Sequence, residues 1–145
     1  MNSILRLIFL TSTTMVLCGG VNAYCIDSVA AIQAKESSRR AKSEIADAKK
    51  LMAALNDVSY EIVGGKTWCN GAQLAADLYL RAAYHYTDAA LEYKKLIRIC
   101  GNYGDRGNAQ VAENNWETSL HNKQVMWDKY ESISDWRDSY CSSSE

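Results

Sequence analysis

The chain of 145 residues contains no proline. Average usage would place about seven prolines in a chain of this length. Proline suits the turns and edge strands of β-rich proteins, but inside an α-helix it removes a hydrogen bond and clashes with the preceding turn. Its absence therefore argues against a β-sandwich, a β-barrel or a loop-rich scaffold, and it favours long uninterrupted helices.

An excess of charge of one sign is also missing. The formal net charge at pH 7 is -1, and the isoelectric point is about 6.1. A chain with this balance has no strong overall field. Neither a nucleic acid nor an anionic membrane surface is therefore indicated as a partner.

Residues 1–23 have the pattern of a secretory signal peptide. A basic residue precedes an apolar stretch, and Val21 and Ala23 supply the small residues that precede a cleavage site. We therefore expect residues 24–145 to form the mature protein as a single helical domain, located in the periplasm or secreted.

Two other interpretations of this N-terminal segment remain open. A transmembrane anchor needs about 20 consecutive apolar residues, whereas hydroxyl-bearing residues interrupt this stretch at positions 11–14. Lipid attachment at Cys18 would use the following Gly19, although Leu17 stands where such signals prefer a small residue. After signal cleavage we expect no membrane span.

Signal cleavage leaves four cysteines, Cys25, Cys69, Cys100 and Cys141. An even number of cysteines in a small exported domain indicates disulfide bonds. No two of them have the C-x-x-C spacing of a zinc ribbon or a thioredoxin, and no histidine follows one as in a c-type haem site. We therefore expect these cysteines to bind no metal and to act as no catalytic nucleophile.

Three segments repeat apolar residues at the three- and four-residue steps of an α-helix. We predict helices at about 26–62, 72–100 and 109–140, joined by glycine-containing loops. Helices of similar length with short connections favour an up-down-up antiparallel three-helix bundle, an all-α fold.

This topology selects one disulfide pairing out of three. Cys25 and Cys100 fall at one end of the bundle, whereas Cys69 and Cys141 fall at the other. Bridged Cα atoms lie within about 7 Å of one another, but the two ends are more than about 40 Å apart at 1.5 Å per residue. We therefore predict the disulfides Cys25–Cys100 and Cys69–Cys141.

The chain offers little material for catalysis. His85 and His121 are the only histidines. His85 lies beside the apolar stripe of the second predicted helix, where a partly buried structural role is the ordinary interpretation. Haem ligation together with Met52 or Met126 is an alternative, since helical bundles can hold haem between their helices. We assign no catalytic residue, no metal ligand and no cofactor.

Charged residues collect on two of the predicted helices. The first carries the basic residues Lys35, Arg39, Arg40, Lys42, Lys49 and Lys50. The third carries the acidic residues Glu113, Glu117, Asp128, Glu131, Asp135 and Asp138. These sets either form solvated faces, or pair with one another across the bundle, or attract a partner of opposite charge.

A second apolar stripe distinguishes the chain from a plain bundle. Leu80, Tyr84 and Leu91 lie opposite the core stripe of the second helix, and Trp136 points away from the core side of the third. Clustered exposed leucine and aromatic side chains are typical of a contact surface. We add the aromatic residues of the two predicted loops. These are Trp68 and Tyr103.

The C-terminal sequence Arg137-Asp138-x-x-Cys141 resembles the terminal motif of a family of small helical periplasmic lysozyme inhibitors, although Ile133 stands where that family has tryptophan. The resemblance implies an inhibitory function. We predict an exported non-enzymatic protein-binding module of inhibitor, immunity or adaptor type, whose partner is another exported protein or a second copy. The alternative is a carrier of a small hydrophobic ligand or haem.

Overall fold

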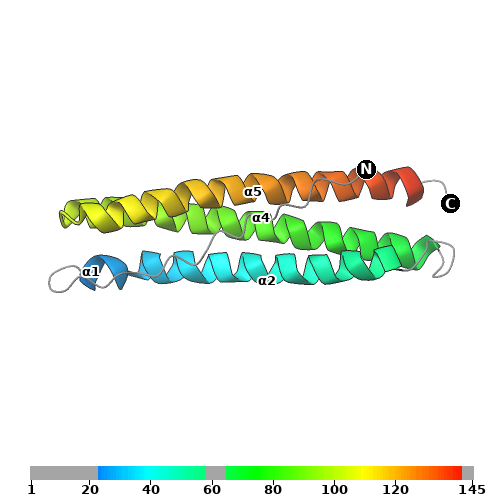
Figure 1. Ribbon diagram of the computed structural model, residues 1–145, viewed down its shortest axis with the longest axis horizontal. Helices are drawn as coiled ribbons and strands as arrows, with labels where there is room; N and C mark the ends of the chain where they lie inside the picture. The colour runs from blue at the N-terminus through cyan, green and yellow to red at the C-terminus, as the bar shows by residue number, and fades with distance from the viewer. Residues whose placement is uncertain (1–22, 58–64, 142–145) are drawn as a thin grey trace.

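The computed structural model describes residues 23–57 and 65–141. This part of the chain is helical, with a short α1 (Ala23–Ile26) and the long helices α2 (Val29–Asp57), α4 (Gly65–Asn102) and α5 (Arg106–Cys141). The long helices lie side by side in an antiparallel, up-down-up order (Figure 1). The predicted all-α three-helix bundle is therefore confirmed, whereas residues 1–22 of the predicted signal peptide lie outside the described residues.

The middle position belongs to α4. It packs against both α2 and α5, while the backbones of α2 and α5 scarcely approach each other (Figure 1). Helix α4 accordingly carries most of the buried side chains, whereas α2 buries only alanines. In the part of the chain that the structure describes, no helix is both long enough and apolar enough to span a membrane.

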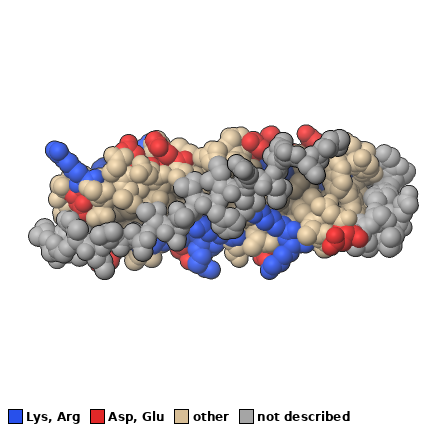
Figure 2. Space-filling model, in the orientation of Figure 1, with Lys and Arg blue, Asp and Glu red and all other residues tan. Residues whose placement is uncertain are grey.

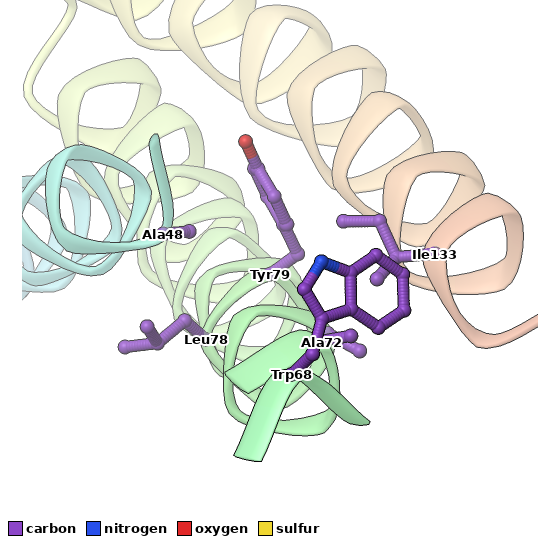
Figure 3. Close-up of a cluster of buried hydrophobic side chains, with 7 residues drawn as sticks. Ala48, Trp68, Ala72, Leu78, Tyr79 and Ile133 are labelled. Carbon is purple, nitrogen blue, oxygen red and sulfur yellow. The ribbon is translucent and has the colours of Figure 1, made fainter. Parts of the chain in front are cut away.

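Core residues recur at seven-residue intervals along each long helix. They are Ala34, Ala41 and Ala48 on α2, Tyr79, Tyr86 and Tyr93 on α4, and Ala112, Ser119, Met126 and Ile133 on α5. A buried alanine on α2 leaves room for a tyrosine of α4, and the α5 residue closes the layer. The bundle is therefore built in layers, one of which Figure 3 shows around Ala48, Tyr79 and Ile133.

The layers become smaller toward the Cys25 end. The α5 residues that complete the layers are, from the Cys141 end to the Cys25 end, Ile133, Met126, Ser119 and Ala112. The volume of this side chain therefore decreases along the bundle. A pocket of about 30 Å³ lies at this end between α2, α4 and α5. Because one water molecule needs roughly 10–15 Å³ of space in a cavity, the pocket has room for about two waters.

Helix α4 begins earlier than the sequence pattern indicates. The predicted start at about residue 72 is wrong, because the glycine-containing segment that we expected to be a loop is already helical from Gly65. Gly71 lies inside the helix, and a Cβ atom there would come within 2.8 Å of the Leu55 side chain. This glycine therefore serves the close approach of α2 and α4 and not a turn.

The connection between α4 and α5 is short. Gly104 adopts a positive φ of 71°, a conformation that costs a residue with a Cβ atom about 1–2 kcal/mol. The next residue, Asp105, is buried, and its carboxylate accepts hydrogen bonds from the backbone and the side chain of Asn108. Asp105 therefore caps the N-terminus of α5.

Both predicted disulfides are confirmed. The Cα atoms of Cys25 and Cys100 are 5.2 Å apart, and those of Cys69 and Cys141 are 6.0 Å apart. The two bonds close opposite ends of the bundle, as the topology requires. Because disulfide bonds persist in oxidising compartments, they indicate an environment outside the cytoplasm.

Candidate functional site

The predicted apolar stripe on α4 lies on the outer side of the helix. Tyr84 and Leu91 are each 56% exposed, and Leu80 is partly buried. The opposite side of α4 holds the buried alanines and tyrosines of the core. Large apolar side chains therefore remain in solvent although α4 packs against two neighbours.

Helix α5 extends this stripe. Leu120 and Trp127 lie three and two heptads before Cys141, and Leu80 lies three turns after Cys69. The Cys69–Cys141 disulfide joins α4 to α5. These side chains therefore lie along the boundary between the two helices, which we call the seam. Leu120 is 40% exposed, and Trp127 is partly buried.

The register of the two helices brings these residues to matching levels. Tyr79 shares a buried cluster with Ile133, and Tyr86 shares one with Met126. Because the helices are antiparallel, Leu91 lies at the level of Leu120, and Tyr84 lies at the level of Trp127. We call the set Leu80, Tyr84, Leu91, Leu120 and Trp127 the seam patch.

The orientation of Trp127 is fixed by its own helix. Its indole Nε1 donates a hydrogen bond to Glu131 Oε1 at 2.8 Å, and its ring lies against Tyr130 with centroids 5.9 Å apart. Neither Leu120 nor Trp127 is among the contact residues predicted from the sequence, although their heptad spacing from Cys141 is the signal that places them on the seam.

Three of the predicted contact residues, Trp68, Trp136 and Tyr103, lie outside the seam patch. Trp68 is not in a loop but in the first turn of α4, and it is only 5% exposed. Its ring packs on Trp136 at a centroid distance of 4.1 Å, and Tyr140 contacts both rings. Figure 3 shows the Trp68 ring beside Ile133 and Tyr79. Trp68 and the partly buried Trp136 therefore stabilise the Cys69–Cys141 end, and Trp68 offers no contact surface.

Tyr103 is accessible but distant from that end. It lies in the turn between α4 and α5 and is 66% exposed. Tyr103 is 35 positions after Trp68, and all the residues between them are in α4, so the two side chains are about 50 Å apart at 1.5 Å per residue. The two predicted aromatic contacts cannot form one site.

The described part of the structure gives no support for a metal site or a haem site. The residues that the structure describes contain no group of three or more side chains suited to hold a metal ion. His85 is partly buried on α4. The pocket near the Cys25–Cys100 disulfide has about 30 Å³, which is far too small for haem.

The charged helices do not pair with each other. Among the described residues, ion pairs lie within one helix or join Arg81 of α4 to Glu44 of α2 at 3.2 Å. Within α2, hydrogen bonds from Arg39 and Arg40 lower the pKa of Glu36 to about 2. In the described part of the chain, the basic side chains of α2 and the acidic ones of α5 are therefore not paired with one another.

No protein family, curated protein or solved structure was found to match the chain.

Proposed function

We propose that this protein is an exported, non-enzymatic binding module of inhibitor, immunity or adaptor type, which recognises another exported protein through the seam patch. The observation that carries the proposal is the exposure of Tyr84, Leu91 and Leu120, at 40–56%, along one seam of two packed helices. Contiguous exposed apolar side chains of this size are typical of protein interaction sites.

The scaffold supports binding by a preformed surface. The seam is held by a disulfide at one end and by the buried layers of α4 and α5 along its length. A rigid surface loses little conformational entropy when a partner docks, so more of the apolar burial contributes to affinity. Tyrosine and tryptophan are also enriched among the residues that dominate binding energy.

The test is affinity capture from the native compartment, followed by titration of the recovered partner. The variant Leu80→Ala/Tyr84→Ala/Leu91→Ala should lose about 100-fold in affinity if each truncation costs about 1 kcal/mol. Leu120→Ala alone should lose about fivefold by the same estimate.

A matched control lies on the outer face of α2. Val29 and Ile32 are 67% and 61% exposed, so Val29→Ala/Ile32→Ala removes similar apolar surface far from the seam. This variant should bind the partner as the wild type does. Equal affinity of the triple variant and the wild type would contradict the assignment of the seam patch.

A further inference from the structure

The edge of α2 that faces α5 carries a row of unpaired lysines. Lys35 lines the small pocket together with Val111 and Asn115 of α5, which places it on that edge. Lys42 and Lys49 follow at seven-residue intervals and therefore share the same edge. All three are exposed, and none makes an ion pair in the described part of the chain.

The edge of α5 that faces α2 carries polar residues at the same seven-residue interval. Asn115 is followed one heptad later by Asn122 and two heptads later by Lys129. Helices α2 and α5 run in the same direction, so each lysine of α2 lies near the level of one of these residues. We call the six residues Lys35, Lys42, Lys49, Asn115, Asn122 and Lys129 the basic groove. Each of them can donate hydrogen bonds, and neither row contains a carboxylate.

The outer edge of α5 has the opposite character. Glu117, Asp128, Glu131 and Asp135 are exposed there, on the side of α5 turned away from α2. At the positions of α5 that are whole heptads away from these four residues, there is no lysine or arginine. Figure 2 shows acidic side chains along the α5 edge and basic side chains over α2. A chain with a net charge of -1 therefore presents a row of lysines on one edge of α2 and a row of carboxylates on the outer edge of α5.

The geometry points to a second copy of this chain as the occupant of the basic groove, bound through the acidic edge of its α5. Asp128 and Asp135 are one heptad apart, as are Lys42 and Lys49. Each heptad rises about 10.5 Å along a helix, so rows of equal period can meet at more than one point. Both complementary surfaces belong to the same molecule.

The two surfaces are different, and this determines the form of the assembly. A copy that places its acidic edge in a neighbour's groove leaves its own groove open for a third copy. Such a contact is heterologous and builds an open chain instead of a closed dimer. Exposed ion pairs are individually weak and are screened by salt, so the association depends strongly on ionic strength.

Sedimentation velocity of the disulfide-bonded protein tests this. At about 0.01 M salt the Debye length is about 30 Å, and at about 1 M it is about 3 Å. We expect the weight-average mass to reach about twice that of the monomer or more in low salt and to return to the monomer value in high salt. A monomer in both salts over the full concentration range would overturn the proposal.

Charge reversal separates this contact from other modes of association. The groove variant Lys42→Glu/Lys49→Glu and the edge variant Asp128→Lys/Asp135→Lys should each be monomeric alone in low salt. Their equimolar mixture should assemble again, because each reversed surface meets its complement. A mixture of helical, folded variants that stays monomeric would refute the contact.

The matched control Lys94→Glu/Arg98→Glu changes the net charge as the groove variant does, but on the outer side of α4. It should assemble as the wild type does, and loss of assembly in this control would show that net charge alone is responsible. Assembly that survives both reversals but is lost in Leu80→Ala/Tyr84→Ala/Leu91→Ala would also overturn the proposal while leaving the seam patch in place.

Discussion

The geometry of the turn between α4 and α5 depends on single side chains. Asp105 accepts a hydrogen bond from the backbone N–H of Asn108 at 3.1 Å and one from its side-chain amide at 2.6 Å. Its own N–H donates to the carbonyl of Cys100 at 2.9 Å. A carboxylate at this position also interacts favourably with the N-terminal end of the α5 dipole.

Removal of this cap should destabilise the whole bundle. We expect Asp105→Ala to lower the free energy of unfolding by about 1 kcal/mol, within the range of about 0.5–2 kcal/mol measured for such caps. Asp105→Asn retains an oxygen acceptor and should lose less. Urea unfolding followed by circular dichroism gives both values, and equal losses would show that the carboxylate does not act as a cap.

At the same scale, the sequence predicted the exposure of some side chains and misplaced others. Tyr84 and Leu91 are exposed as their helical positions indicate. Trp68 was misplaced because the nearby glycines resemble a loop, whereas its burial depends on Trp136 and Tyr140, more than 60 positions away in the sequence. Spacing along one helix shows which side a residue occupies, but it does not show which distant side chain covers it.

The long helices differ in the size of the side chains that they bury in the core. Helix α2 buries only small side chains, and Ala41 is fully buried against Tyr86 and Ala82. The layered pattern was present in the sequence as heptads on three helices, but only the register between helices shows that an alanine meets a tyrosine. The early start of α4 was missed for the same reason. Gly71 lies inside the helix because its lack of a side chain leaves room for Leu55 of α2, a contact that the spacing along α4 does not show.

Enlarging one of these alanines tests the layer. We expect Ala41→Leu to lower the free energy of unfolding by about 1–3 kcal/mol, because added methylenes in a filled core force neighbouring side chains to move. Ala46 lies on the same helix but is exposed, so Ala46→Leu should change the stability by less than about 0.5 kcal/mol. Similar losses in both variants would mean that α2 is not closely packed on α4.

For the whole molecule, alternating helix direction was sufficient to predict the disulfides. The residues of each pair are separated by 75 and 72 positions, so each closed loop contributes about 4 kcal/mol in the chain-entropy model. The two ends nevertheless differ in packing. The Cys69–Cys141 end contains the Trp68, Trp136 and Tyr140 rings, whereas at the Cys25–Cys100 end the disulfide packs with Ala31, Leu96 and Ala112 beside a pocket.

This asymmetry predicts different responses to loss of each disulfide. In Cys25→Ser/Cys100→Ser, α1 and the first turns of α2 lose their main attachment to α4, so their backbone amides should exchange with solvent much faster than in the wild type. In Cys69→Ser/Cys141→Ser, the aromatic cluster still joins α4 to α5, so the last turns of α5 should keep more of their protection. Hydrogen exchange followed by mass spectrometry compares the two. Equal loss of protection at both ends would show that the disulfides, and not the packing, hold each end together.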